Sequence, residues 1–238
     1  MDRKKGFYEK YIKRLLDIIC SLLAIVVFSW LYAIIAVIVR VKMGSPVLFK
    51  QPRPGIVKNG KETIFDMYKF RTMTNERDEN GDLLPDDKRL PAFGAWLRKT
   101  SLDELPEAIN ILKGDMSVIG PRPQLVRDMV FMTEEQRHRH DVRPGLSGLA
   151  QINGRNSISW DDKLALDLEY LKHISFGYDT KIVLMTVGSV WKRKDITEDD
   201  HVTASDYGDV LLADGRVTRQ EYLEKQREAE RLLAEVGF

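Results

Sequence analysis

The stretch IICSLLAIVVFSWLYAIIAVIV, residues 18–39, decides how this chain folds. It runs for 22 residues without a formal charge. As a helix it would be about 33 Å long, close to the thickness of a bilayer core. A signal peptide has a shorter apolar core and a small-residue cleavage site, whereas Arg40, Val41 and Lys42 follow here. We therefore favour a membrane-anchoring helix over the buried core helix of a soluble protein.

Basic residues flank both ends of this segment. Lys13 and Arg14 stand before it, and Arg40 and Lys42 stand after it. A simple crossing usually has its Lys and Arg excess on the cytoplasmic side only. Basic flanks on both sides fit a re-entrant helix that enters and leaves one leaflet, and they also fit a crossing with weak charge bias. The residues alone leave these two topologies open.

The overall composition excludes some functions. The 238 residues carry 37 basic and 36 acidic side chains, a net charge of +1, which gives no reason to expect a nucleic acid partner. Cys20 is the sole cysteine and lies in the apolar run. An intrachain disulfide is therefore impossible, and a cysteine-based metal or redox site has nothing to build on.

After the anchor, the pattern predicts a mostly α protein with a few short β-strands, an α+β fold. Strands are expected at 46–50 and 62–70, separated by a turn-rich stretch, with a short extended piece at 116–119. Exposed or irregular loops are expected at 74–91, around Asn80-Gly81, and at 141–156. Helices are expected at 93–98, at 105–112 with a stop at Lys113-Gly114, and at 125–140, 160–174, 179–193 and 219–236.

Asp103 and Glu104 stand at the approach to one of these helices. Pro106 suits a first helical turn, and Ser101-x-x-Glu104 matches a capping box, so a helix cap is one explanation of the pair. The other explanation is chemical. A carboxylate can attack phosphorus to form a covalent acyl phosphate, and it can bind Mg²⁺ together with substrate phosphates.

A pyrophosphate substrate also needs cations around it, and arginine binds phosphate in a bidentate manner. The candidates are Lys69, Arg98, Arg122, Arg143 and Arg155. Three of the arginines lie in rigid turns, Pro121-Arg122-Pro123, Arg143-Pro144-Gly145 and Asn153-Gly154-Arg155, which suit ligand contact. His138 and His140 do not match a zinc spacing and are interpreted as polar residues at a helix end, and Asp115 as a structural partner of an arginine.

Six motifs in order carry a resemblance to a known family. They are Tyr68-Lys69-Phe70-Arg71-Thr72-Met73, Ser101-Leu102-Asp103-Glu104-Leu105-Pro106, Lys113-Gly114-Asp115-Met116-Ser117, Gly120-Pro121-Arg122-Pro123, Arg143-Pro144-Gly145-Leu146-Ser147-Gly148 and Gln151-Ile152-Asn153-Gly154-Arg155. Together with the basic start and membrane helix, they resemble the bacterial sugar transferases, the monotopic phosphoglycosyl transferases. The stretches 75–90 and 137–160 resemble the small bacillosamine-phosphate transferase type. The resemblance runs from about residue 10 to residue 195.

The resemblance implies a reaction and a set of roles. Asp103 would attack the β-phosphate of a UDP-sugar, release UMP and hold a phosphosugar that undecaprenyl phosphate then accepts. Glu104 would complete the catalytic pair, by assisting metal binding or by accepting a proton. Mg²⁺ would be the cofactor, bound at Asp103. The residues expected to bind substrate are Lys69, Arg98, Arg122, Arg143, Gln151 and Arg155.

The resemblance also implies an architecture in three parts. Residues 1–45 would form a basic start and a re-entrant membrane helix, 46–195 a compact catalytic domain on the membrane surface, and 196–238 a polar extension with an amphipathic helix. The protein would sit in the bacterial inner membrane, in contact with membrane lipid, with its catalytic domain in the cytoplasm. Family members commonly break the membrane helix at a Ser-Pro pair, whereas this chain has Phe28-Ser29-Trp30 and no proline before residue 46. A serine hydroxyl bends a helix more weakly than proline does.

Several alternatives stay open at this point. The donor could be an N-acetylated amino sugar such as UDP-di-N-acetylbacillosamine, or the chain could be a hexose-1-phosphate transferase for exopolysaccharide that uses UDP-glucose or UDP-galactose. A membrane phosphohydrolase and an inert scaffold for glycan enzymes are the competing classes. The 219–236 helix could pack on the domain, bind a partner or form a homodimer.

Overall fold

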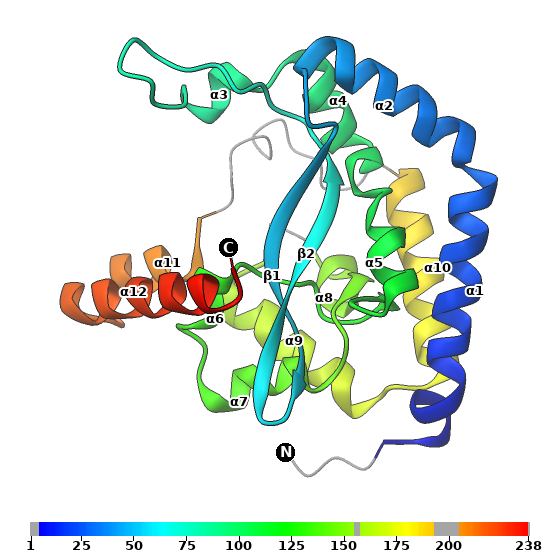
Figure 1. Cartoon of the computed structure of the whole chain (residues 1–238). Helices are drawn as coiled ribbons and strands as arrows, with labels where there is room; N and C mark the ends of the chain where they lie inside the picture. Colours follow the sequence, from blue (N-terminus) through cyan, green and yellow to red (C-terminus); the bar gives the residue numbers. More distant parts are fainter. Residues whose placement is uncertain (1–4, 155–157, 193–204, 238) are drawn as a thin grey trace.

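The computed structural model describes residues 5–154, 158–192 and 205–237. Helices dominate these residues, with two-stranded sheets between them, which confirms the predicted α+β class (Figure 1). The elements up to residue 113 are α1 (Lys13–Val27), α2 (Ser29–Met43), β1 (Leu48–Lys58), β2 (Lys61–Phe70), α3 (Asp86–Arg89), α4 (Ala92–Lys99) and α5 (Glu107–Lys113). The later ones are β3 (Ser117–Ile119), α6 (Val126–Met129), α7 (Glu134–Arg137), β4 (Gly145–Ser147), α8 (Leu149–Ile152), α9 (Trp160–Lys172), α10 (Phe176–Lys192), α11 (Tyr207–Ala213) and α12 (Arg219–Glu235).

Strands β1 and β2 form a long antiparallel hairpin in which Lys58 pairs with Lys61. Asn59 and Gly60 have φ values of 52° and 77°, the positive pair that a tight hairpin turn requires. The turn is therefore confined to these residues, and the predicted turn across 52–60 is wrong. Pro52 and Pro54 instead lie within β1, which is tolerated because the sheet has two strands and an irregularity follows Pro54.

Helix α5 is fixed against β2 by a buried amide. The Asn110 side chain donates to the Asp66 carbonyl at 2.7 Å and accepts from the Tyr68 amide at 2.9 Å. The helix ends where predicted, because Gly114 adopts a φ of 94° that closes its last turn. The predicted extended piece that follows is β3, and it pairs in parallel with β4. The region predicted as a loop at 141–156 therefore contains strand β4 and the short helix α8. The strand has three residues and the helix four, which is too few for a hydrophobic periodicity to be recognised in the sequence.

The predicted helix over 125–140 is wrong as a single element. The structure has α6, then α7, then a 3₁₀ turn at His138–Asp141. Thr133 starts α7 with a capping box to Gln136, which interrupts the longer helix. Helices α4, α5, α9, α10 and α12 lie where the sequence predicted them, and α11 was not predicted.

A bent helix pair stands at one side of the molecule (Figure 1). No single described helix is long and apolar enough to cross a bilayer, whereas Tyr8–Val27 and Ser29–Met43 meet that criterion together, with a 63° bend between them. The bend falls at Phe28, beside the predicted Ser29. Each half is held by a different part of the domain, because Asp17 accepts from the Ser117 hydroxyl and Tyr32 donates to the Leu105 carbonyl.

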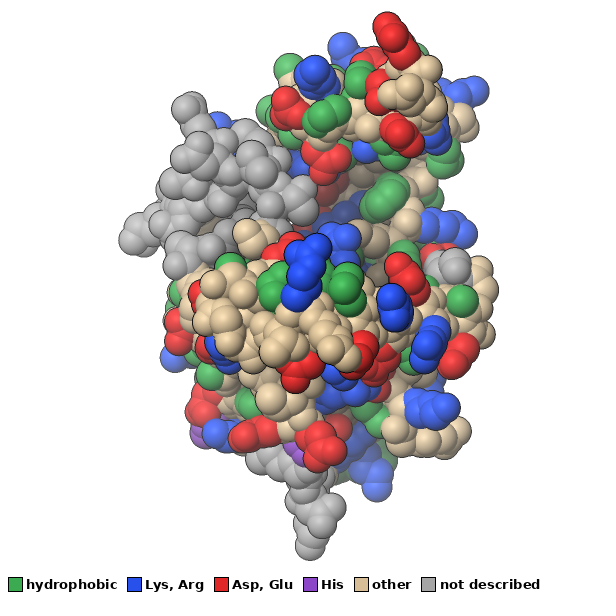
Figure 2. All heavy atoms as spheres, turned by 90° about the vertical axis from the view of Figure 1, so that its left-hand side faces the viewer, with side chains coloured by type: hydrophobic (Ala, Val, Ile, Leu, Met, Phe, Trp, Pro, Cys, Tyr) green, Lys and Arg blue, Asp and Glu red, His purple; other side chains and the backbone are tan. Residues whose placement is uncertain are grey.

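The C-terminal helices α11 and α12 pack against α6, so the described part of the C-terminal extension packs on the predicted catalytic domain. Tyr207, Leu211 and Ala229 are buried with Val126 and Met129 in one hydrophobic cluster. On this side of the molecule, opposite α1, acidic and basic side chains are interspersed (Figure 2). The predicted boundary at residue 195 lies outside the described residues.

A buried ion pair braces the loop around Arg122. The Arg139 guanidinium donates from Nε and Nη2 to Asp167 Oδ2 at 2.9 and 2.6 Å, and from Nη2 to the Arg122 carbonyl at 2.6 Å. Both side chains are almost fully buried. Burial raises the pKa of Asp167, and the Arg139 charge opposes that rise.

We predict that Arg139→Gln lowers the free energy of unfolding by about 3–5 kcal/mol, because it leaves the Asp167 carboxylate buried without a counter-charge. Thermal and denaturant unfolding of the full chain in mild detergent measures this loss. The double replacement of Arg139 by Met and Asp167 by Leu should recover most of it. A loss below about 1 kcal/mol in the single variant would contradict a structural role for the pair.

Candidate active site

Three charged side chains from separate elements meet beside the start of α5. Glu104 lies in a 3₁₀ turn, Leu102–Glu104, Lys69 comes from β2, and Arg122 comes from the loop after β3. Lys69 Nζ lies 2.9 Å from Glu104 Oε1, and Arg122 Nη2 donates to the same oxygen. The two cations hold the pKa of Glu104 well below its usual range despite burial, and Glu104 raises the pKa of Arg122 in return. Glu104 is therefore a fixed anion.

The predicted capping box at Ser101 is absent. Ser101 has a φ of 55°, a left-handed conformation that is uncommon for residues other than glycine, and its side chain caps nothing. The Glu104 side chain turns toward Lys69 and Arg122 and away from the backbone at Ser101. The carboxylates thus belong to a charged cluster and do not serve as a helix cap.

Asp103, the neighbour of Glu104, is buried at 7% exposure. Burial and the nearby Glu104 charge raise its pKa to about 6, while Lys69, Arg122 and Arg98 act in the opposite direction. Among the hydrogen bonds and ion pairs of the described residues, none involves the Asp103 carboxylate. Near neutral pH this group is an ionised carboxylate whose oxygens are free to form a new bond.

A third carboxyl group, Glu107, lies behind the first two and was missed by sequence reasoning. It is 0% exposed, neither oxygen has a hydrogen-bond partner, and Lys69 Nζ lies 3.5 Å from Oε1. Burial and the neighbouring Glu104 raise its pKa to about 7. Its position one turn after Glu104 was the available signal, but an acidic residue in a first helical turn usually interacts only with the helix dipole.

Arg98 stands beside Asp103 from helix α4. Its Nε donates to the Thr72 hydroxyl at 3.0 Å, and the Asp103 charge acts on it. Thr72 follows strand β2, so the hairpin and α4 together orient this guanidinium. Burial lowers the pKa of Arg98, yet arginine stays protonated at neutral pH.

The loop that carries Arg122 is braced on both sides by other arginines. Arg53 Nη1 donates to the Pro123 carbonyl at 3.1 Å, and Arg139 donates to the Arg122 carbonyl. The loop also needs glycine, because a Cβ at Gly120 would lie 2.5 Å from the Arg143 carbonyl oxygen. Arg53 was missed, although Pro52-Arg53-Pro54 repeats the local pattern of Pro121-Arg122-Pro123.

Two of the remaining predicted substrate residues, Arg143 and Gln151, make their hydrogen bonds outside this cluster. Arg143 donates from Nε to the Gly114 carbonyl at 2.9 Å, at the far end of α5. Gln151 donates to the Leu146 carbonyl at 2.9 Å, and its Oε1 is buried without a hydrogen-bond partner, close to Gly148. Arg155 lies outside the described residues.

Asp115 and the two histidines have other surroundings. Asp115 lies 3.4 Å from Lys113 Nζ and 3.2 Å from Asn110 Nδ2, and its charge also acts on Arg14, an arginine outside the set predicted to bind substrate. His138 Nδ1 lies 3.0 Å from Asp141. His140 is buried beside Glu62, and burial lowers its pKa to about 4.

Comparison with known proteins gives a consistent result. The model of the family described as "Bacterial sugar transferase" matches residues 8–193. Bacillus subtilis (strain 168) "Uncharacterized sugar transferase EpsL" is 48% identical, over 84% of this chain and 98% of that protein. The "Undecaprenyl-phosphate glucose phosphotransferase" of Komagataeibacter xylinus is 35% identical, over 74% of this chain and 35% of that protein.

A third relative, from Aeromonas hydrophila, is named "UDP-N-acetylgalactosamine-undecaprenyl-phosphate N-acetylgalactosaminephosphotransferase". It is 37% identical, over 76% of this chain and 44% of that protein. The chain therefore spans nearly all of EpsL but less than half of the two relatives whose names state a substrate.

We predict that the unfolding free energy of Glu107→Gln, compared with that of wild type, increases as the pH rises. The folded-state pKa of Glu107, about 7, exceeds the ordinary value of 4.5, so the folded state binds more protons between these values. Wild type therefore loses stability as the pH rises through this window, and the glutamine variant lacks that loss. The difference in unfolding free energy should grow by on the order of 2 kcal/mol between pH 5 and pH 8.

Unfolding of both proteins across that pH range in detergent provides the measurement. Glu135→Gln, at an exposed carboxylate in the first turn of α7, is the control and should track wild type. A Glu107→Gln difference that stays constant with pH would contradict the assignment of a protonated Glu107.

Proposed function

The chain belongs to the bacterial sugar transferase family, and from this premise we propose that it transfers a sugar-1-phosphate from a UDP-sugar to undecaprenyl phosphate. The observation that carries the proposal is the state of Asp103. Its carboxylate is buried, has no hydrogen-bond partner among the described residues, and lies beside a fixed Glu104–Lys69–Arg122 cluster. A carboxylate in such a place is suited to attack phosphorus.

In the first half of the proposed reaction, an Asp103 oxygen bonds to the β-phosphorus of the UDP-sugar. The bond from that phosphorus to the bridging oxygen breaks, UMP leaves, and an aspartyl phosphosugar remains. Negative charge develops on the phosphoryl oxygens and on the leaving UMP. Arg98 and Arg122 flank Asp103 and are placed to stabilise this charge.

In the second half, a phosphate oxygen of undecaprenyl phosphate attacks the same phosphorus. The bond to the Asp103 oxygen breaks, the carboxylate is restored, and the lipid carries a diphosphate-linked sugar. The lipid phosphate is largely ionised at neutral pH, so little proton removal is needed. Glu104 has a pKa depressed by two cations and is therefore a weak base. We assign it the role of holding Lys69 and Arg122 in place.

Mg²⁺ is part of the proposal as a cofactor bound together with substrate. Among the described residues, no three His, Cys, Asp or Glu side chains are grouped to hold a metal. Mg²⁺ usually takes one or two carboxylates and completes its shell with water and substrate phosphates. Asp103, whose oxygens have no partner among the residues that the structure describes, fits that donor set. When bound, the ion would neutralise charge on the pyrophosphate.

We further propose that the bent helix pair is a re-entrant anchor in the inner membrane, with the domain on the cytoplasmic side. Basic residues flank both ends of the apolar segment, as expected if both ends lie on one side. Large apolar side chains are exposed along both halves, among them Leu23, Val26, Trp30 and Val37. Helix α10 also exposes Leu184 and Val187, so it could rest on the same lipid surface.

The donor sugar has two candidates. An N-acetylated amino sugar such as UDP-di-N-acetylbacillosamine follows from the resemblance at 75–90 and 137–160, and a hexose follows from relatives named for glucose or galactose. The relative named for N-acetylgalactosamine fits the first candidate. A panel of UDP-sugars separates them.

We predict that the purified full chain, with Mg²⁺ and undecaprenyl phosphate, releases UMP from at least one UDP-sugar of this panel. Asp103→Asn should lower the rate about 1,000-fold or more, because the amide is a poor nucleophile at phosphorus. UMP release is measured by a coupled assay, and the covalent phosphosugar by the intact mass of the protein mixed with donor alone.

The matched control is Asp87→Asn, which removes a carboxylate from an exposed turn and should keep the wild-type rate. No UMP from any donor by folded protein would overturn the transferase in favour of a scaffold. Repeated turnover without lipid would identify a hydrolase.

We predict that the two ends of the helix pair are labelled from the same side of the membrane. In a Cys20→Ser background, Gly6→Cys and Lys42→Cys place single thiols before and after the pair, at exposed positions. An impermeant maleimide should label both in inverted vesicles and neither in intact spheroplasts. Labelling of the two thiols from opposite sides would refute the re-entrant topology.

A further inference from the structure

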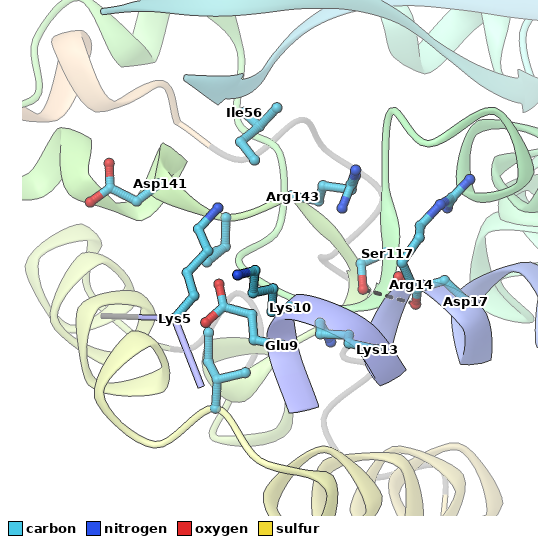
Figure 3. A pocket seen from close by; sticks show the side chains of 12 residues that line it. Lys5, Glu9, Lys10, Lys13, Arg14, Asp17, Ile56, Ser117, Asp141 and Arg143 are labelled. Atoms are coloured by element: carbon cyan, nitrogen blue, oxygen red, sulfur yellow. Dashed lines mark hydrogen bonds between the residues drawn. The ribbon is translucent and has the colours of Figure 1, made fainter. Parts of the chain in front are cut away.

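A cavity of about 630 Å³ lies at the N-terminal end of α1 (Figure 3). Its walls come from the π-helical turn Tyr8–Ile12, from the start of α1, and from the segment around Arg143. Five basic and three acidic side chains line it. The basic ones are Lys5, Lys10, Lys13, Arg14 and Arg143.

Two of these basic groups already bind other residues of the protein. Lys13 Nζ lies 2.5 Å from Asp179, and Arg14 donates to the carbonyls of Ile111 and Leu112 at 2.6 and 2.8 Å. The other three differ, because within the described segments no ion pair includes Lys5, Lys10 or Arg143. Arg143 uses only Nε in its bond to Gly114, so both terminal nitrogens remain for a ligand.

The three acidic side chains of the lining offset part of this charge without balancing the five basic ones. Asp17 accepts from the Ser117 hydroxyl and from the Val118 amide, each at 2.9 Å, and Asp141 lies 3.0 Å from His138. Glu9 projects into the cavity between Lys5 and Lys10 and offsets part of their charge (Figure 3). An excess of positive charge remains on the walls.

The two arginines add a second indication. Arg14 and Arg143 both bond at the C-terminal end of α5 and lie close enough for their charges to repel, a repulsion that the charges of Asp17 and Asp115 partly offset at Arg14. An anion between or beside them would relieve that repulsion and would gain charge-assisted hydrogen bonds from a guanidinium. Phosphate is the anion whose oxygens match a guanidinium and two ammonium groups together.

We propose that this cavity is a second phosphate site, which holds the phosphate headgroup of an anionic lipid. The apolar side chains around it indicate an amphiphile over a free ion. Phe7 is 72% exposed and Tyr11 57% exposed on the segment that carries Lys5 and Lys10, and Phe176 of α10 is 60% exposed beside Tyr8. An acyl or prenyl chain could lie along them while its phosphate enters the cavity.

This site is separate from the one around Asp103. The carboxylates stand at the first turn of α5, whereas Arg14 and Arg143 bind carbonyls of its last turn. Seven residues of helix separate the two by about 10 Å. Binding here does not depend on sugar transfer, so the inference stands or falls independently of the proposed function.

Native mass spectrometry of the full chain in neutral detergent tests the proposal. The probes are dioleoyl phosphatidic acid, dioleoyl phosphatidylcholine and inorganic phosphate. Wild type should retain one phosphatidic acid, with at least about 10-fold preference over phosphatidylcholine, and the Lys5→Gln, Lys10→Gln double variant should bind it about 10-fold more weakly. The control is the Lys58→Gln, Lys61→Gln double variant at the hairpin tip, which removes the same charge at exposed positions and should bind as wild type does.

A third variant examines Arg143 without removing its charge. Arg143→Lys keeps a cation but loses the planar fork, and should weaken phosphatidic acid binding about 3- to 10-fold while the protein stays folded. Equal losses in the two lysine double variants would overturn the site in favour of general surface attraction. If millimolar inorganic phosphate displaced the lipid and raised the thermal stability of the protein as much as phosphatidic acid does, a free phosphate and not a lipid would be the occupant.

Discussion

The buried amide of Asn110 is the contact on which the arrangement of the site depends. It joins α5 to the backbone of β2 through the Asp66 carbonyl and the Tyr68 amide. This fixes the position of Lys69, the next residue of the strand, relative to Glu104 before the helix and Glu107 at its first position. A buried amide with both partners satisfied specifies one register, because any slip leaves polar groups without hydrogen bonds in the interior. The chemistry therefore rests on a helix–strand contact that itself carries no charge.

The site brings together three carboxyl groups and three cations in a small buried volume. Its charge state depends on which carboxyl group binds the cations. Glu104 takes Lys69 and Arg122, which keeps it ionised. Burial, together with the adjacent Glu104 charge, raises the pKa of Asp103 to about 6 and that of Glu107 to about 7. The result is one permanent anion, Glu104, one carboxylate that is mostly ionised near neutral pH, Asp103, and one carboxyl that titrates around neutral pH, Glu107. Lys69 and Arg122 lower the pKa of both groups, and Arg98 acts in the same direction on Asp103.

The sequence was sufficient for features with a local signal. The apolar segment, the Gly114 stop, and the identity of Asp103, Glu104, Lys69 and Arg122 all follow from short motifs or periodicity. It failed where tertiary contacts decide. The Ser101 cap is lost because Glu104 finds stronger partners 18 and 35 residues away in the chain. Pro52 and Pro54 lie in a strand because that strand has a free edge. Arg143 and Arg122 look alike as arginines beside proline, yet only the fold shows that they lie at opposite ends of one helix.

The bent helix pair contacts both ends of that same helix. Tyr32 of α2 donates to the Leu105 carbonyl at 2.5 Å, just before α5, and Arg14 of α1 donates to the carbonyls of Ile111 and Leu112 at its end. The two halves of the pair therefore contact opposite ends of α5, and the 63° bend lies between these two contacts. The bend forms at Phe28 without a proline in either helix. The helix that follows the Asp103 turn is thus held at both ends by the bent helix pair, which links the proposed anchor to the site through hydrogen bonds.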